Sequence, residues 1–279
     1  MNSPREKAHT TPGVSRVAVE RWRDGAHESC LDSVAAEVPV ALEYNGLSHT
    51  VMLASPADLE DFALGFSLTE GIVDSPGDIL GCEIAETGEG IRIGMRISGE
   101  CFSRLDDRRR NLAGRTGCGL CGVENLRQVR RDLPAVRASA TMTIAALRRG
   151  LEGLPAFQTL QRLTGAAHAA AWISGEGAIV CAREDVGRHN ALDKLIGALA
   201  RQGGDFGAGA ALITSRASYE MVQKAAAAGI GIVAAVSAPT SFAVRLAEEL
   251  NVTLLGFLRP NGQVLYTHGF RLRLPAGRD

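Results

Sequence analysis

The stretch Ala210–Phe257 reads AALITSRASYEMVQKAAAAGIGIVAAVSAPTSFAVRLAEELNVTLLGF. Three short apolar runs within it, 210–214, 230–236 and 252–257, have the length and composition of buried strands. Two amphipathic segments of helical length, 219–228 and 240–250, separate these runs. Strands that alternate with helices predict parallel pairing through crossover connections. The stretch therefore predicts a sheet that is covered by helices on both faces.

The same alternation continues on either side of this stretch. Helices are expected upstream at 141–151, 157–163 and 185–200, strands lie between them at 169–173 and 178–182, and a last strand follows at 263–267. Together these segments predict an α/β fold with a three-layer α/β/α domain over residues 140–279.

Residues 14–135 have a different character and predict a smaller α+β domain. Asn45-Gly46 is a hairpin-turn dipeptide between two expected strands, Val38–Tyr44 and His49–Ala54. Ser55-Pro56 then predicts an N-cap and first position of a helix. A further strand is expected at 91–97. Residues 1–13 are polar and mixed in charge, and we expect them to form a tail.

The segment 103–122 shows no apolar period and is rich in arginine and glycine. We expect it to be a mobile, basic loop. It contains the two cysteines that are paired at short spacing, in Gly117-Cys118-Gly119-Leu120-Cys121-Gly122.

Composition and charge exclude several classes of protein. Of 279 residues, 46% are hydrophobic, and the formal net charge is −1, so the chain is not a nucleic-acid-binding polycation. The longest uncharged apolar run, 225–236, is too short to span a bilayer, and the first residues lack the apolar core of a secretory signal. We therefore expect a cytoplasmic protein that binds neither membrane nor nucleic acid.

A C-x-x-C pair has three common uses: half of a zinc site, a redox dithiol, or a carrier of sulfur as a persulfide. No second short-spaced pair of ligands completes a zinc site, and a glycine-rich loop is a poor setting for a tightly poised disulfide. Neighbouring arginines favour a thiolate, which persulfide chemistry requires. Two incidental cysteines in a solvated loop remain the alternative.

Two loops between expected strands and helices offer an anion site at one edge of the sheet. They are 214–218, which contains Arg216 and Ser218, and 237–241, which contains Ser237 and Thr240. Helix N-termini present free N–H groups and partial positive charge that suit a phosphate. Ordinary capping by serine and threonine is the alternative. No dinucleotide, nucleoside-triphosphatase or zinc-protease motif is present.

Five segments together resemble the FdhD family of formate dehydrogenase accessory sulfurtransferases. They are Arg115-Thr116-Gly117-Cys118-Gly119-Leu120-Cys121-Gly122, Thr164-Gly165-Ala166-Ala167-His168-Ala169-Ala170, Glu184-Asp185-Val186-Gly187-Arg188-His189-Asn190-Ala191-Leu192-Asp193-Lys194, Ser215-Arg216-Ala217-Ser218-Tyr219-Glu220 and Gly256-Phe257-Leu258-Arg259. The string from Glu184 to Lys194 is highly specific, whereas C-x-x-C alone is not.

The resemblance implies a function. Such proteins accept persulfide sulfur from a cysteine desulfurase and pass it to the molybdenum bis(molybdopterin guanine dinucleotide) cofactor before that cofactor enters formate dehydrogenase. Cys118 is then the expected persulfide carrier and Cys121 its partner. The resemblance makes the segment Phe257, Leu258, Arg259, Pro260, Asn261 and Gly262 the expected cofactor-binding segment. From the pattern of helix starts we add Arg216, Ser218, Ser237, Thr240 and His189 as expected cofactor-binding residues.

The resemblance also implies a homodimer and a fold that joins a small α/β roll to a cytidine-deaminase-like domain. A guanine nucleotide is the expected mimic of the cofactor. The H-x-E and P-C-x-x-C zinc signature of the deaminases is absent from the second half, so we expect no metal site. A cofactor-binding chaperone without thiol chemistry and a zinc-stabilised scaffold remain as alternatives.

Overall fold

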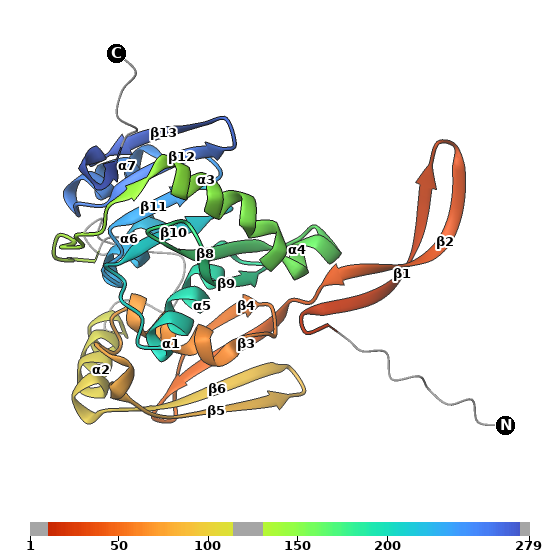
Figure 1. Ribbon diagram of the computed structural model, residues 1–279. Helices are drawn as coiled ribbons and strands as arrows, with labels where there is room; N and C mark the ends of the chain where they lie inside the picture. The colour runs from red at the N-terminus through yellow and green to blue at the C-terminus, as the bar shows by residue number, and fades with distance from the viewer. Residues whose placement is uncertain (1–10, 114–130, 274–279) are drawn as a thin grey trace, which may run out of the picture.

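The computed structural model describes residues 11–113 and 131–273. A large mixed sheet with its helices forms one part of the molecule, a smaller sheet with two helices forms the other, and a two-stranded arm projects from the side (Figure 1). The expected α/β fold class is confirmed.

The large sheet has the strand order β13-β12-β11-β10-β8-β9. Its strands are β8 (His168–Ser174), β9 (Ile179–Asp185), β10 (Gly209–Ile213), β11 (Ile232–Ala235), β12 (Thr253–Arg259) and β13 (Gly262–Thr267). Only β10, β11 and β12 run parallel, whereas β8, β9 and β13 pair antiparallel with their neighbours. The expectation of parallel pairing throughout was wrong, because tight turns rather than helices join β8 to β9 and β12 to β13.

Helices cover both faces of this sheet and make two separate cores. One core packs α5 (Arg188–Arg201), α6 (Tyr219–Ala227) and α7 (Ser241–Glu249) on residues such as Trp172 and Val233. The other core packs α3 (Ile144–Gly153) and η3 (Leu154–Phe157) on alternate residues of the same strands, such as Ile173 and Ile232. The short elements α4 (Thr159–Thr164), β7 (Met142–Thr143), η4 (Gly269–Arg271) and β14 (Leu272–Arg273) complete this part.

The smaller sheet has the order β4-β3-β6-β5, built from β3 (Val38–Tyr44), β4 (Leu47–Ala54), β5 (Ile79–Thr87) and β6 (Gly90–Ile97), with η1 (Pro76–Asp78) before β5. Asn45 and Gly46 have φ of 49° and 82° and form the expected hairpin turn. The helix α1 (Leu59–Thr69) covers one face. Its N-cap is Asp58, not Ser55, because Ser55 is used in contacts with the large domain.

The predicted loop 103–122 is wrong over its first part, because Ser103–Ala113 belongs to the helix α2 (Gly99–Ala113). Cys101 and Leu105 lie one turn apart and are buried in the core of the small sheet. Arg104 pairs with Asp74, so one arginine that we assigned to a solvated loop holds the helix in place. Residues 114–122 lie outside the described chain.

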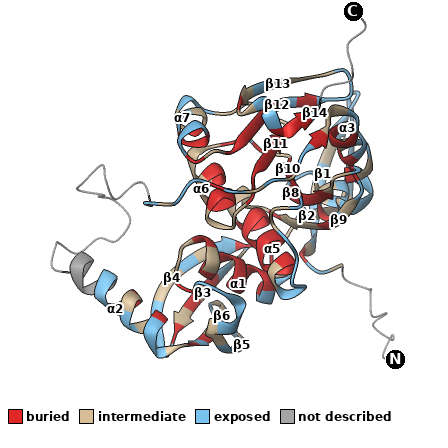
Figure 2. Ribbon diagram, turned by 60° about the vertical axis from the view of Figure 1, so that its left-hand side comes forward, coloured by how far each residue is buried: buried red, intermediate tan, exposed pale blue. Residues whose placement is uncertain are grey.

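The two parts meet where α1 crosses α5, both of them buried along the contact (Figure 2). Glycine makes this crossing possible. A Cβ on Gly65 would lie 1.7 Å from the carbonyl oxygen of Asp193, and one on Gly197 would lie 1.9 Å from that of Asp61. Since no side chain fits at either position, the two backbones are in direct contact.

The arm is the hairpin of β1 (Val14–Arg23) and β2 (Ala26–Ala35), which the sequence did not lead us to expect. Asp24 and Gly25, with φ of 51° and 80°, form its two-residue turn. Gly13, which we placed in the N-terminal tail, is buried, and its carbonyl accepts a hydrogen bond from the N–H of Ala36 at 2.7 Å. Residues 1–10 of the expected tail lie outside the described chain.

Candidate functional site

Cys118 and Cys121, the expected sulfur-carrying pair, lie outside the described residues. The described chain on either side is fixed to one turn at the end of α1. Before the gap, Arg108 donates to the carbonyls of Glu70 and Gly71 at 3.4 and 3.1 Å. After it, the Arg131 guanidinium donates to the carbonyl of Thr69. The chain therefore leaves and re-enters the described structure near the junction of the two domains.

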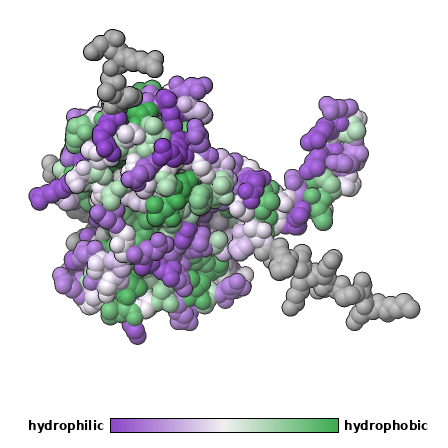
Figure 3. Space-filling view, in the orientation of Figure 1, coloured by the Kyte–Doolittle hydropathy of each residue, from purple (hydrophilic) through white to green (hydrophobic). Residues whose placement is uncertain are grey.

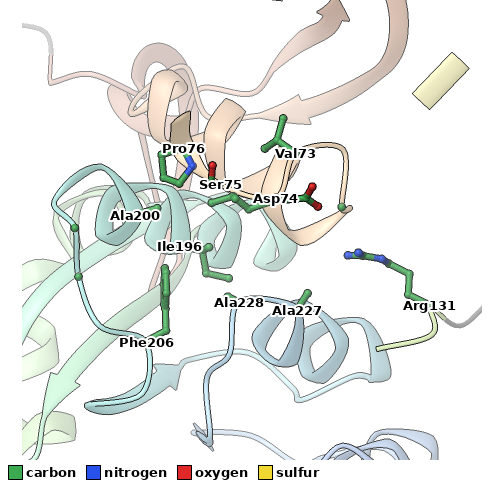
Figure 4. Close-up of a pocket in the computed structure, with 14 residues that line it drawn as sticks. Val73, Asp74, Ser75, Pro76, Arg131, Ile196, Ala200, Phe206, Ala227 and Ala228 are labelled. Carbon is green, nitrogen blue, oxygen red and sulfur yellow. The ribbon is translucent and has the colours of Figure 1, made fainter. Parts of the chain in front are cut away.

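A hollow of about 510 Å³ lies beside this turn (Figure 4). Ile196 and Ala200 of α5, Ala227 and Ala228 at the end of α6, and Phe206 form an apolar wall. Arg131 extends toward the loop that carries Asp74 on the opposite side. Burial lowers the pKa of the Arg131 guanidinium. The hollow is thus largely apolar, with one cationic and one acidic side chain.

The two loops that we expected to form an anion site are neighbours in space. Ala217 and Pro239 form a parallel β-bridge. The N–H of Ala217 donates to the carbonyl of Ala238 at 3.2 Å, and the N–H of Thr240 donates to the carbonyl of Ala217 at 3.0 Å. The starts of α6 and α7 therefore lie side by side at the carboxyl ends of β10 and β11, where a parallel sheet collects its ligands.

The hydroxyls at these two helix starts differ in use. Thr240 Oγ1 accepts a hydrogen bond from the N–H of Ala243 at 3.3 Å and caps α7, so its capping role is structural. Ser218 is the N-cap of α6 but makes no such bond, and its buried Oγ has no hydrogen-bond partner in the described chain. Arg216 is exposed at the same edge.

Polar atoms without partners gather here. Within residues 11–113 and 131–273, four buried side-chain nitrogen or oxygen atoms make no hydrogen bond: Arg148 Nε, Arg188 Nε, His189 Nε2 and Ser218 Oγ. Three of them belong to the first residues of α5 and the cap of α6. A buried polar atom without a partner costs free energy, so such a cluster calls for a ligand or ordered water.

His189 joins the starts of the two helices. Its Nε2 lies 2.7 Å from a carboxylate oxygen of Glu220, so this nitrogen has an ion-pair partner and is not open to a ligand. The contact with His189 lowers the pKa of Glu220. Glu220 therefore fixes the imidazole in place between α5 and α6.

Sequence reasoning missed two neighbours of His189, namely Arg188 and His168. His168 lines a hollow of about 430 Å³ with Gln161 and Thr214. Burial, and then the charge of Arg188, lower the pKa of His168, which keeps its imidazole neutral at pH 7. Both residues stand in motifs that we had singled out, so the signal was present, but nothing in the sequence places them together.

The segment Phe257–Gly262 reaches the same edge through a distortion of β12. Phe257 has φ of 51°, in the left-handed region that a bulky residue rarely adopts, and its N–H donates to the carbonyl of Ser237 at 3.2 Å. The ring is 45% exposed. Leu258 is fully buried in the core with α3, so its side chain cannot contact a ligand. Arg259, Pro260 and Asn261 are exposed, and Gly262 is half-buried.

Most of the string from Glu184 to Lys194 is structural. Lys194 Nζ lies 2.7 Å from Asp185 Oδ2, and both side chains are 0% exposed. The Lys194 ammonium is therefore buried in an ion pair and does not face the ligand edge. The ammonium also donates to the carbonyl of Ser55, and Asp185 accepts the N–H of Ser55, both at 3.0 Å. These residues join the two domains.

Glu184, the first residue of the string, also has a structural role. Its carboxylate accepts the N–H groups of Leu160 and Gln161 at 2.7 and 2.8 Å and so caps α4. Of this string, Arg188 and His189 lie at the start of α5, next to the start of α6.

Known proteins match this chain over most of the described residues. The FdhD/NarQ family model matches residues 35–273. The chain belongs to the FdhD/NarQ family. It is 59% identical over 243 residues to a sulfur carrier protein FdhD of Bordetella petrii, with 87% of each chain covered. It is 57% identical over 262 residues to one of Cupriavidus necator, covering 94% of this chain and 91% of that one.

A solved structure shares the fold. The crystal structure of a protein from Desulfotalea psychrophila, assigned to the formate dehydrogenase accessory proteins, matches with a TM-score of 0.72 at 23% identity. The match covers 94% of this chain and 100% of that one. Among the helices of the described ranges, none is long and apolar enough to cross a bilayer.

Proposed function

We propose that this chain is a cytoplasmic sulfurtransferase that matures formate dehydrogenase. It accepts persulfide sulfur from a cysteine desulfurase on Cys118 and transfers it to the molybdenum bis(molybdopterin guanine dinucleotide) cofactor, its substrate, before the cofactor is inserted. Membership of the FdhD/NarQ family and relatives named as sulfur carriers, aligned over most of both chains, support this proposal.

The chemistry balances with the two thiols alone. The Cys118 thiolate attacks the terminal sulfur of the donor persulfide, one S–S bond forms, another breaks, and the donor cysteine leaves as a thiolate. Attack by Cys121 on the Cys118 sulfur would then release the outer atom as sulfide and leave a Cys118–Cys121 disulfide. Cys121 thus supplies the two electrons that the transferred sulfur gains.

One observation carries the cofactor part of the proposal. The partnerless atoms of Arg188 and Ser218 lie at the starts of α5 and α6, on the edge that Phe257 and the 237–240 loop also reach. Cationic and N–H donors at helix N-termini suit the phosphates of a guanine dinucleotide. We assign the ring of Phe257 and the turn Arg259–Gly262 to the same ligand.

Binding of GDP, as a mimic of the cofactor, tests this assignment. Arg188→Met keeps the length of the side chain and removes the charge, so we expect GDP affinity to fall about tenfold or more. Stability should not fall, because Arg188 Nε has no protein partner to lose. Arg162→Met, an exposed position on α4, is the matched control. Unchanged GDP affinity in the Arg188 variant would remove this edge from the cofactor site.

The rival function is a cofactor-binding chaperone without thiol chemistry. Complementation of a deficient host separates the two functions. We expect Cys118→Ala to bind GDP normally yet fail to restore formate dehydrogenase activity, whereas a chaperone would restore it.

A further inference from the structure

The β1–β2 arm has two outer strand edges that could each pair with a further strand. Its ten-residue strands pair without a break from Val14 opposite Ala35 to Arg23 opposite Ala26. Within the described chain neither outer edge of this two-stranded sheet has a strand partner. An isolated two-stranded ribbon is marginally stable in water, and long unprotected edges invite pairing.

Apart from the charged side chains of β1, the arm lacks the devices that keep an edge strand unpaired. Residues 14–35 contain no proline and no lysine, and the register shows no bulge. Trp22 and Leu31 are 69% and 64% exposed. The arm stands clear of the body, and its hydrophilic surface is interrupted by a few hydrophobic patches (Figure 3). Only its base is packed, where Gly13 approaches Leu160 of α4.

The sequence of β1 is complementary to itself in one antiparallel register. When Ala18 of one copy faces Ala18 of another, Val17 faces Val19, Arg16 faces Glu20, and Val14 faces Trp22. Each of these pairs occurs twice, once on either side of the two-fold axis. Opposite charges and apolar side chains are thus matched directly across the strands, which stabilises such pairs.

The second strand does not offer this match. Pairing of β2 with itself about Cys30 would set Glu28 against Asp32, two like charges. Pairing about Leu31 would set no charge against its opposite. In the arm itself, Glu20 accepts a hydrogen bond from Ser29 at 2.8 Å, so its carboxylate is held on the face that Arg16 shares. Charge complementarity therefore selects β1 and the register centred on Ala18.

We infer that β1 of two copies of this chain pair edge to edge, antiparallel about Ala18, to give a continuous four-stranded sheet in the order β2-β1-β1-β2. The arm is the surface that makes the homodimer. This inference rests on the unpaired edges of the arm and the charge pattern of β1, and it does not depend on sulfur transfer.

Charge reversal tests the surface and the register together on the full-length chain. Arg16→Glu and Glu20→Arg each replace two opposite-charge pairs by two like-charge pairs. We expect each variant to dimerise roughly tenfold or more weakly than wild type in sedimentation velocity. An equimolar mixture of the two variants restores every pair, so it should form a mixed dimer of near wild-type affinity. Arg23→Glu, an exposed reversal at the tip of β1 that faces no charge in this register, should leave the dimer unchanged.

The outcomes that overturn the inference are distinct. A monomeric wild type at micromolar concentration, or two reversal variants that dimerise as tightly as wild type, would exclude the arm as the interface. Weakened variants whose mixture stays monomeric would exclude the register. The Ala18→Cys variant gives a second measurement, because a disulfide between its two introduced thiols forms only if the Ala18 positions face each other. Sulfur loading of the same variants reports separately on the proposed function.

Discussion

At the scale of single residues, the ligand edge is marked by side chains whose bonding is incomplete. Arg188 and Ser218 each bury a polar atom without a partner, while Thr240 completes a cap on the next helix. From the sequence, the hydroxyls of Ser218 and Thr240 were equally good candidates for ligand binding, since both residues follow a strand and precede a helix. Only the structure separates the threonine that caps from the serine that does not.

His168 leads to a prediction about pH. Its pKa in the folded protein lies below the ordinary value of about 6.5, so the unfolded chain binds more protons and stability falls as pH drops below that value. We expect wild type to lose more stability than His168→Gln between pH 7 and pH 5 in urea unfolding. The effect should be modest, because His168 is only half-buried. Equal losses in both proteins would contradict the assignment.

At the scale of elements, the spacing of apolar residues predicted most helices and strands correctly. It failed where an element buries few apolar residues. The helix α2 buries Cys101 and Leu105 among many charged residues, so the apolar period was too sparse to recognise. The arm was missed because its strands alternate without a buried face. For α2 the deciding contact is tertiary packing on the small sheet. For the arm we infer that it is a contact with a second copy of the chain.

The crossing of α1 and α5 gives a prediction at this scale. Gly65→Ala places a methyl group against the carbonyl of Asp193, so the helices must separate. We expect a loss of about 3 kcal/mol or more in the free energy of unfolding, measured in urea. Gly99→Ala is the control, since a Cβ there meets no atom within 4 Å. A Gly65 variant as stable as this control would contradict the close contact between the two helix backbones.

At the scale of the whole molecule, buried charges join the two domains. Lys224 of α6 donates to Asp193 of α5 at 3.0 Å and to Glu70, at the end of α1, at 2.7 Å. Lys194 and Asp185 contact Ser55 in the same way. The specific string of residues was recognisable in the sequence, but its joining role was not, because Ser55 lies about 130 residues away.

The Lys194 pair predicts how the domains unfold. Lys194→Met leaves Asp185 buried without its counter-ion, which costs roughly 3–5 kcal/mol. We expect a lower unfolding temperature in calorimetry and, because the lost contacts span both domains, a broader or split transition. Arg162→Met, which removes an exposed arginine from α4, should change stability far less. A single transition at the wild-type temperature would refute the joining role.

The central claim, that Cys118 carries sulfur, is tested most directly by intact mass. After incubation with a cysteine desulfurase and cysteine, wild type should gain the mass of one sulfur atom, which a thiol reductant then removes. Cys118→Ala should gain none, while a substitution of the exposed Cys82 should load like wild type. Equal sulfur on wild type and Cys118→Ala would contradict the account.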